Sequence, residues 1–389
     1  MKIMIVLAYL HGGGAERVAT ILANNFVQSG HKVIFATNKK RSDEPFVYSI
    51  DERVTLSKCY ERFLEPRKNK VLQNLIDKSG LVRHAYHFVF SRFEPYVTLR
   101  RIMVREKPDV ILGFLHTASF QALIASLGTD AIVISTEHNA FERPAGVPFP
   151  FKSRFFKFVV NKYFKAVTVL TSTDGRIARK TLKNVRVIPN PLSFKVHDKT
   201  GTEKRQKRIV AAGRLDAWHC KGFDLLIEAW GKIARKCEGW SLEIAGCGSE
   251  DSVSLLKTLI KQNGVEDSVT LSGFQNDISA VFRKAEIFVL SSRYEAFGMV
   301  LIEAMSQGCA CIACDYNGRQ REIIKNDSEG IIVEPGNAEA LSEAMMRLVC
   351  NDYDRMAIRE CGLLRSCEYE ASKITQYWLK LFNELSVLK

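Results

Sequence analysis

Short apolar segments alternate with helix-like segments along this 389-residue chain, and this alternation constrains the fold more than any other feature. Continuous apolar strands separated by helices predict a parallel sheet that is covered by helices on both faces. Each half of the chain has its own series. The first comprises KIMIVLAY (2–9), HKVIFATN (31–38), DVILGFL (109–115), AIVISTE (131–137) and AVTVLTS (166–172), and the second comprises RIVAAG (208–213), SLEIAG (241–246), SVTLSG (268–273), EIFVLSS (286–292), CACIAC (309–314) and GIIVEP (330–335). We therefore predict an α/β protein with two tandem doubly wound, Rossmann-like domains that face a central cleft.

The domain boundaries follow from these two series. The segment 187–208 contains two prolines and then a polar, charged run without periodicity, so it is the best candidate for the interdomain linker. We assign residues 1–190 to an N-terminal domain and residues 191–370 to a C-terminal domain. Residues 371–389 are expected to form a final helix, because their apolar residues recur at helical spacing.

Charge is distributed unevenly between the halves. Residues 1–190 contain 30 Lys and Arg against 15 Asp and Glu, whereas residues 191–389 contain 26 against 28. A basic half implies an anionic partner, either a nucleic acid or an acidic membrane surface.

The composition otherwise predicts a soluble globular protein, and no apolar stretch reaches the ~18 residues that a membrane-spanning helix needs. We interpret the opening MKIMIVLAYL as a buried strand and not as a signal peptide, because a glycine turn follows it directly.

The ten cysteines are too irregularly spaced for a disulfide framework, which fits a reducing cytoplasm. Cys309, Cys311 and Cys314 match no common zinc spacing, so we expect them to be small core residues on a strand. An Asp-x-Asp pair that could hold a metal occurs only at Asp352 and Asp354, far from any early strand, and we interpret it as a solvated turn between helices. We expect neither a metal nor a cofactor.

A glycine-rich turn follows the first strand. In HGGGAERVA, Gly13 and Gly14 would let the backbone approach a ligand, and the next helix would offer its N-terminal amides to an anion. The turn is not a dinucleotide-binding GxGxxG, because residue 17 is Arg, and the second strand ends at Asn38 without an acidic residue for a ribose. A glycine turn that only packs is the alternative.

The second domain opens with a strand and a turn that carries two cations. In AAGRLDAWHCKGFDLL, Arg214 and Lys221 would leave a strand–turn–helix connection, which is an arrangement that brings two positive charges onto a diphosphate. Two merely solvated basic residues are the alternative.

SSRYEAFGMVLIEAMSQG (291–308) places Glu295 in a turn and Glu303 inside an apolar helix. A buried carboxylate without a partner costs several kcal/mol, so a ligand or a fixed donor should meet Glu303. A helix that begins near Phe297 and Gly298 would direct its positive end at a phosphate, and Glu303 could bind vicinal hydroxyls such as those of a ribose. The alternatives are a helix-start role for Glu295 and an arginine partner for Glu303.

Together these motifs resemble the family-4 retaining glycosyltransferases of GT-B fold. The resemblance rests on GGGAER, GRL…KGFDLLIEA and the E-x7-E of EAFGMVLIEAM, and the similar organisation covers essentially the whole chain. It implies that the C-terminal domain binds a nucleotide-sugar, the N-terminal domain binds the acceptor, and the final helix crosses back to the first domain. UDP is the expected nucleotide.

The resemblance also implies roles for individual residues. It places Arg214 and Lys221 on the diphosphate, Glu303 on the ribose and Glu295 on hydroxyls of the donor sugar. Further residues would contact the donor or its surroundings: the amides of Phe297, Gly298 and Met299 at the distal phosphate, Gly13 and Gly14 near the phosphates, His138 near the sugar, and Asn190 at the interdomain turn. The chain departs from the family after this helix, because NGRQRE (317–322) replaces the usual G-G-x-x-E; Gly318 and Glu322 correspond, whereas Arg319 and Arg321 are additions.

The resemblance implies a mechanism without metal, in which Arg214, Lys221 and helix amides stabilise the departing diphosphate. Retention implies front-face attack with the leaving phosphate taking the acceptor proton, so we assign no catalytic base. The expected acceptor is a glycan or a polyprenyl-diphosphate-linked glycan of surface polysaccharide synthesis. A nucleic-acid-binding protein, a GT-B sugar-nucleotide epimerase and a phosphorylase are the alternatives; no nucleic-acid-binding signature is present, and nothing marks a pyridoxal lysine.

Aromatic and basic residues are interleaved in FPFKSRFFKFVVNKYFKAV (149–167), and residues 67–107 add ten cations among further aromatics. Basic amphipathic helices of this kind lie on anionic membranes. We therefore expect a cytoplasmic enzyme that is peripheral on the inner face of the cytoplasmic membrane. An ordinary basic helix face is the alternative.

Overall fold

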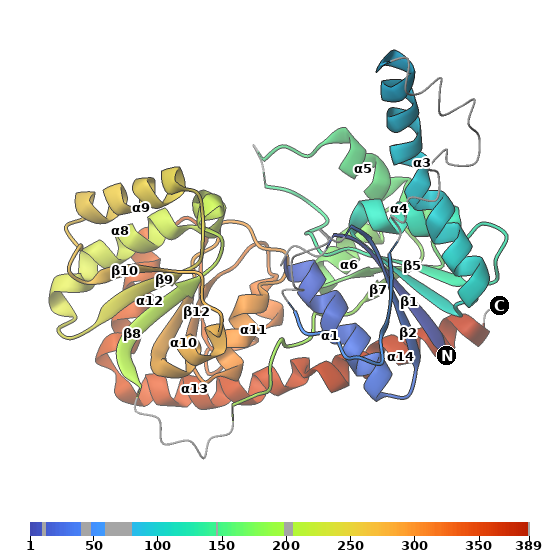
Figure 1. The fold of residues 1–389 in the computed structure, drawn as a ribbon. Helices are drawn as coiled ribbons and strands as arrows, with labels where there is room; N and C mark the ends of the chain where they lie inside the picture. The colour runs from blue at the N-terminus through green and yellow to red at the C-terminus, as the bar shows by residue number, and fades with distance from the viewer. Residues whose placement is uncertain (10–12, 40–47, 59–79, 145–146, 198–204, 388–389) are drawn as a thin grey trace. The chain divides into compact units, whose positions relative to one another are not determined.

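The computed structural model describes residues 1–9, 13–39, 48–58, 80–144, 147–197 and 205–387, and it divides the chain into two compact units. Unit 1 comprises Met1–Val169, Gly175–Ile188 and Thr375–Lys389, and unit 2 comprises Leu170–Asp174 and Pro189–Ile374. Each unit contains one parallel sheet with helices packed on it, so the predicted pair of Rossmann-like domains is confirmed (Figure 1).

The sheet of unit 1 has seven strands in the order β3-β2-β1-β4-β5-β6-β7. The sequence analysis anticipates five of them and misses β3 and β7, which form the two edges. The strands are β1 (Lys2–Tyr9), β2 (Lys32–Lys39), β3 (Thr55–Lys58), β4 (Val110–Phe114), β5 (Ile132–Thr136), β6 (Ala166–Val169) and β7 (Val185–Val187). The helices are α1 (Gly14–Gln28), α3 (Gly80–Glu106), α4 (Leu115–Ala125), α5 (Phe151–Phe158), the part of α6 (Ser172–Ala178) from Gly175 onward and most of α14 (Ala371–Val387), with a 3-10 turn η1 (Val160–Tyr163).

Side chains of successive strand residues point to opposite faces of this sheet, and both faces are buried. Met4 and Val6 of β1 belong to a core that includes residues of α3, α4 and α5. The final helix α14 contributes Phe382, whose ring lies 5.6 Å from that of Phe26 in α1. Residues Thr375–Lys389 therefore belong to unit 1, although they follow unit 2 in the sequence.

The sheet of unit 2 has six strands in the order β10-β9-β8-β11-β12-β13, all of which the sequence analysis anticipates. The strands are β8 (Gln206–Ala212), β9 (Ser241–Ala245), β10 (Val269–Gly273), β11 (Ala285–Leu290), β12 (Ala310–Cys314) and β13 (Ile331–Val333). The helices are α7 (Trp218–Lys221), α8 (Phe223–Ile233), α9 (Glu250–Gln262), α10 (Ile278–Lys284), α11 (Met299–Ser306), α12 (Ala338–Cys350) and α13 (Asp352–Ser366), with 3-10 turns η2 (Leu215–Ala217), η3 (Ala234–Lys236), η4 (Gln320–Glu322) and η5 (Cys367–Tyr369).

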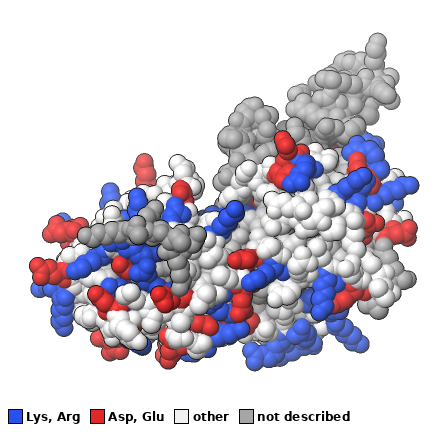
Figure 2. Space-filling view, turned by 90° about the horizontal axis from the view of Figure 1, so that it is seen from below, with Lys and Arg blue, Asp and Glu red and all other residues white. Residues whose placement is uncertain are grey.

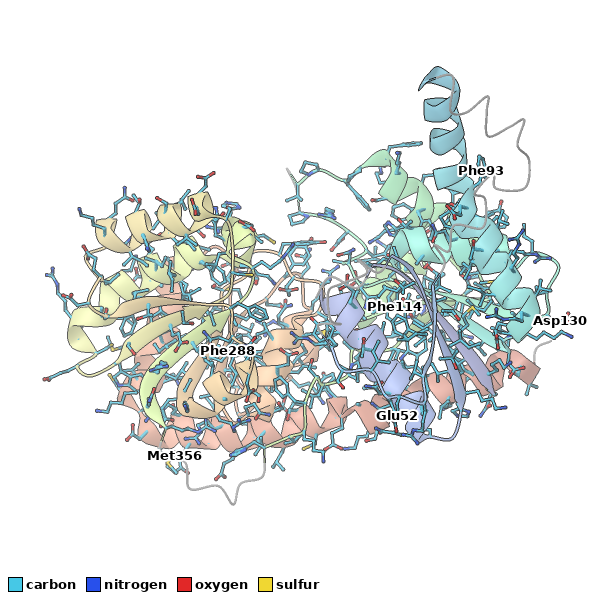
Figure 3. The ribbon with its side chains drawn as sticks, in the orientation of Figure 1. Glu52, Phe93, Phe114, Asp130, Phe288 and Met356 are labelled. Carbon is cyan, nitrogen blue, oxygen red and sulfur yellow. The ribbon has the colours of Figure 1, made fainter. Side chains whose placement is uncertain are left out.

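This second sheet separates two hydrophobic cores. Ile287 and Val289 of β11 pack with residues of α8, α9 and α12 on one face. Phe288, labelled in Figure 3, and Leu290 pack with residues of α10 and α11 on the other. Because both faces are covered, the strands read as unbroken apolar runs in the sequence.

The structure places the three cysteines of β12 and the turn before it in the core of unit 2, and the Asp-x-Asp pair at a helix start. Cys309, Cys311 and Cys314 are buried, as expected of core residues, and burial raises the pKa of the Cys309 and Cys314 thiols to about 12. Asp352 and Asp354 do not lie in a turn between helices: they form the first turn of α13, where Arg355 and Arg347 pair with them. Both aspartates thus stabilise a helix start.

The expected linker 187–208 is partly fixed to unit 2. His197 N–H donates to the carbonyl of Ser306 at 2.8 Å, and Gln307 Nε2 donates to the carbonyl of Lys195 at 3.0 Å. Residues 198–204 of this segment lie outside the described part of the chain. Among the described helices, none is both long enough and apolar enough to cross a membrane.

Candidate functional site

The carboxyl ends of β8 and β11 lie side by side in unit 2, because these strands are adjacent and parallel. The turn after β8 ends at Gly222, whose φ is +65°, and a Cβ there would lie 2.0 Å from the carbonyl oxygen of Ser291. Only glycine permits this close approach. The Ser291 hydroxyl donates to the carbonyl of Lys221 at 2.8 Å and so fixes the two turns against each other.

This contact brings Lys221 and Glu295 together, 74 positions apart in the sequence. Lys221 Nζ lies 2.5 Å from Glu295 Oε2, and both side chains are about one-fifth exposed. Burial alone would lower the pKa of Lys221, but the charge and hydrogen bond of Glu295 together raise it. The lysine is therefore cationic and its charge is accessible to a ligand.

The neighbouring Arg214 follows β8 and has an exposed side chain. No hydrogen bond or ion pair joins its guanidinium to any other described residue. An exposed, always charged guanidinium is suited to a bidentate contact with phosphate oxygens.

Helix α11 begins one turn beyond Glu295. Its N-cap is Gly298, with φ +88° and no side-chain cap, so the first amides of the helix are not satisfied by a capping side chain. Phe297 is buried with its ring 5.8 Å from that of Tyr369, while Met299 is partly exposed. The start predicted near Phe297–Gly298 agrees with this helix to within two residues.

Glu303 is buried on α11, and a fixed donor does meet it. The Ser193 hydroxyl donates to Glu303 Oε1 at 2.5 Å. Sequence reasoning did not find Ser193, which lies 110 positions away in the expected linker. Asn190 is buried in the same segment, between Pro189 and Pro191.

The segment 317–322, whose sequence departs from the expected G-G-x-x-E, is held by contacts with residues 172–174 of unit 2. Arg319 is buried, and its Nη2 and Nε lie 2.7 and 3.2 Å from the carboxylate oxygens of Asp174. The Glu322 carboxylate accepts the N–H groups of Ser172 and Thr173 at 2.6 and 2.8 Å. Nothing in the sequence points to these pairings. They explain why Leu170–Asp174 groups with unit 2, although the residues on either side of it belong to unit 1.

Gln320 adds a polar group that sequence reasoning missed. Its side chain is buried, and its Oε1 accepts the N–H of Tyr316 at 2.7 Å. No described residue accepts a hydrogen bond from its Nε2, which would lie 3.9 Å from a Cβ placed on Gly298. A buried donor without an acceptor costs free energy and calls for a partner, and this one lies beside the start of α11.

The remaining predicted residues lie in unit 1, at the carboxyl edge of its sheet. Gly13 caps α1 and Gly14 begins it, but the Gly13 N–H already donates to Glu16 Oε2 at 3.0 Å. His138 follows β5, with its ring stacked 4.9 Å from that of Phe114 and its Nε2 3.1 Å from the Thr136 hydroxyl. No group of three His, Cys, Asp or Glu within the described ranges could hold a metal ion.

Comparison with known families covers nearly the whole chain. Residues 12–195 match the model "Glycosyltransferase Family 4", and residues 193–363 match "Glycosyl transferases group 1".

Among curated relatives, mannosylfructose-phosphate synthase of Agrobacterium fabrum is 33% identical over 86% of this chain and 78% of its own length. A Campylobacter jejuni protein is 27% identical over 99% of both chains and is named GalNAc-alpha-(1->4)-GalNAc-alpha-(1->3)-diNAcBac-PP-undecaprenol alpha-1,4-N-acetyl-D-galactosaminyltransferase.

Solved structures show the same fold at low sequence identity. A variant of S. aureus TarM in complex with Fondaparinux, alpha-GlcNAc-glycerol and UDP has a TM-score of 0.78 and 16% identity, covering 98% of this chain and 99% of its own. Anabaena HepE in complex with UDP and glucose has a TM-score of 0.75 and 16% identity, covering 98% and 99%.

Proposed function

The chain belongs to the family-4 glycosyltransferases of GT-B fold, and we propose that it transfers a hexosyl residue, with retention, from a UDP-sugar to a glycan or polyprenyl-diphosphate-linked glycan. The observation that carries the donor side is the Lys221–Glu295 pair at the start of α11. One cation and one carboxylate side by side suit a ligand that has a diphosphate and a sugar.

The donor diphosphate is assigned to Lys221, Arg214 and the amides of Phe297, Gly298 and Met299. The positive end of α11 adds to the two side-chain cations, as is usual at helix N-termini that bind phosphate. Gln320 Nε2 gains its missing acceptor if a phosphate or sugar oxygen lies beside Gly298. UDP is favoured because two solved structures of similar fold, TarM and HepE, contain it.

The nucleoside and the sugar are assigned to the two glutamates. Glu303 accepts hydrogen bonds from the ribose hydroxyls and is kept in place by Ser193. Glu295 accepts from hydroxyls of the sugar, and its pairing with Lys221 fixes its position before the donor binds. Asn190 lies two residues after Ile188, where the chain passes from unit 1 to unit 2, and is assigned to the turn that connects the domains.

In this mechanism bond cleavage leaves negative charge on the diphosphate, and fixed cations and amides stabilise it in the transition state more than in the bound donor. The leaving phosphate takes the acceptor proton, so no protein base is assigned. The acceptor is assigned to unit 1, which also contains His138 and the Gly13–Gly14 turn. A lipid-linked acceptor is favoured by the undecaprenol-linked substrate named for the Campylobacter jejuni relative.

Isothermal titration calorimetry of the full chain against UDP-, GDP- and ADP-sugars tests the donor assignment. We expect micromolar binding of at least one UDP-sugar and of UDP. Product analysis with labelled donor then separates transfer from epimerisation and hydrolysis, because only transfer joins the labelled sugar to the acceptor. Folded protein that binds no nucleotide-sugar would refute the proposal.

Helix α5 and the turn after it are assigned to an anionic membrane surface that presents the acceptor. Phe151 is 80% exposed and Phe155 is 48% exposed, and Lys152 and Arg154 are exposed on the same short helix. The interleaved segment 149–167 is not a single basic helix, however: α5 ends at Phe158, and Lys157 is buried. The cations predicted between residues 67 and 92 lie outside the described residues and side chains.

Exposed aromatic rings next to cations favour the interface of an anionic bilayer. On the face shown in Figure 2, by contrast, described basic and acidic side chains are interspersed and form no single basic stripe of the kind that tracks a nucleic acid. Flotation with vesicles of phosphatidylglycerol and phosphatidylcholine tests the membrane assignment. The variant Phe151→Ser/Phe155→Ser should lose most binding, whereas Phe274→Ser, which removes a 66% exposed ring in unit 2, should not. Equal flotation on neutral vesicles would refute the assignment.

A further inference from the structure

A second cluster of polar side chains lies in unit 1, at the carboxyl ends of the adjacent strands β4 and β5. Glu137 follows β5 and is buried. Its carboxylate accepts from Asn161 Nδ2 at 2.9 Å and contacts His116 Nε2 at 3.1 Å, and Lys157 Nζ lies 3.8 Å away. Lys157 is itself anchored by the carbonyl of Ala140 at 2.6 Å.

Charges in this cluster determine which nitrogen of His116 carries hydrogen. Burial would raise the pKa of Glu137, but the charge of Lys157 and the hydrogen bonds from His116 and Asn161 together lower it to about 2. The carboxylate can only accept, so Nε2 of His116 must bear the hydrogen that faces it. In the neutral ring Nδ1 is then a hydrogen-bond acceptor, held in a fixed tautomer by the carboxylate.

The ring of His116 is partly exposed and held in place, so it can contact a ligand. It packs 4.7 Å from the ring of Phe156, its side chain is 25% exposed, and no described residue hydrogen-bonds its Nδ1. The residue before it, Leu115, has a φ of +64°, which is uncommon for a non-glycine residue and is a strain that clusters at functional sites. His138 occupies the equivalent place after β5, stacked on Phe114 (labelled in Figure 3).

We propose that Nδ1 of His116 accepts a hydrogen bond from a hydroxyl of the acceptor saccharide, adjacent to the hydroxyl that attacks, and that Glu137 is its positioning residue. The inference rests on the proposed function, since it assumes that unit 1 binds a saccharide. The contact selects which acceptor hydroxyl reaches the donor. It leaves the proton of the attacking hydroxyl available to the departing phosphate.

The long-range 1H–15N NMR spectrum of the histidine rings tests this directly in the wild-type chain. Methyl glycosides of glucose, N-acetylglucosamine and N-acetylgalactosamine serve as acceptor probes at millimolar concentration, and UDP serves as the donor-site probe. At least one glycoside should shift the 15N resonance of His116 Nδ1 upfield, while UDP should leave it unchanged. No shift with any glycoside, or a shift with UDP alone, overturns the inference.

Two variants of His116 distinguish binding from mere packing. Asparagine places an acceptor near the Nδ1 position, whereas glutamine places a donor near the Nε2 position and keeps the contact with Glu137. We expect His116→Gln to raise the KM for the glycoside about tenfold and to leave the UDP dissociation constant within twofold, with His116→Asn closer to wild type. A purely structural role predicts the reverse order.

His31→Gln is the matched control, because His31 lies in the same unit but precedes β2, at the opposite edge of the sheet. It should leave glycoside and UDP binding unchanged. Wild-type calorimetry with UDP-sugars keeps the two hypotheses apart: donor binding without a His116 response refutes only this inference, whereas absent donor binding refutes the proposed function.

Discussion

The two members of the Lys221–Glu295 pair should change UDP affinity in opposite directions when they are removed one at a time. In the free protein the two side chains are 2.5 Å apart and partly neutralise each other. UDP carries the diphosphate that Lys221 binds in our proposal but lacks the sugar that Glu295 binds. The carboxylate therefore competes with UDP for the lysine and contributes nothing in return.

The magnitudes follow from the geometry. Lys221→Ala removes charge-assisted hydrogen bonds, each with a net contribution of about 1.5–3 kcal/mol, so UDP should bind about 10- to 100-fold more weakly. Glu295→Gln removes a negative charge close to the diphosphate. At about 6 Å and an effective dielectric constant of about 20 the repulsion is about 3 kcal/mol. Because the pair is about one-fifth exposed and screened by solvent, we expect about 1 kcal/mol, which is about fivefold tighter binding.

Calorimetry with UDP at fixed ionic strength measures both effects, and initial rates with a UDP-sugar complete the test. Transfer should fall strongly in both variants, since Glu295→Gln weakens the contact with the sugar while it strengthens the contact with UDP. Lys232→Ala is the matched control: its Nζ lies 2.6 Å from Glu339 Oε2 on the surface of the same unit, and UDP affinity should not change. If Lys221→Ala and Glu295→Gln weaken UDP binding equally, Lys221 does not bind the diphosphate in competition with Glu295.

Three further outcomes are expected. Gly298→Ala should lower the free energy of unfolding in urea by about 1–2 kcal/mol and should also weaken UDP binding. Gly264→Ala, also at positive φ (+63°) but with open space around its Cβ position, should lower stability without changing UDP binding. The environment of Glu137 lowers its pKa from 4.5 to about 2, so its ionised form contributes about 3 kcal/mol of stability above pH 4.5, and this contribution is lost as the pH falls toward 2. The difference in unfolding free energy between wild type and Glu137→Gln should therefore narrow over that interval, and a constant difference contradicts the assignment. Arg319→Met leaves Asp174 buried without its cation and should cost about 3–5 kcal/mol, partly recovered by adding Asp174→Asn; no recovery in the double variant would show that the pair is not the cause.

Sequence pattern predicted the inner strands of both sheets and failed at the edges of the first. Strands such as β4 and β12 are buried along their whole length, so they appear as unbroken apolar runs. The missed strands β3 (TLSK) and β7 (VRV) each have a neighbour on one side only, and they are short and partly polar. Edge strands of this kind lack the signal on which the prediction depends.

Within the candidate site, local motifs located the chemistry but not its contacts. Lys221 and Glu295 each follow a strand, and the topology rule for parallel sheets places such residues at one edge. The 2.5 Å contact between them depends on the glycine at 222 and on the Ser291 hydroxyl, which no spacing rule connects.

Residues 149–167 do not form one basic amphipathic helix, and the Glu137 cluster explains why. Alternating Phe and Lys residues suggested a basic outer face, but Lys157 turns inward to meet the carboxylate of Glu137. A signal was present in STEHN: Glu137 directly follows an apolar strand, which is as costly a place for a charge as the middle of a helix.

Two buried carboxylates, Glu303 and Glu137, show what the local sequence can and cannot predict, because each has partners that are distant in the sequence. For Glu303 that partner is Ser193, 110 positions earlier, and for Glu137 it is a set of three side chains on α4, α5 and η1. Glu137 is matched by the buried cation of Lys157, which suits a permanent scaffold for His116, whereas the Ser193 hydroxyl meets Glu303 at a position where a ribose can add further donors.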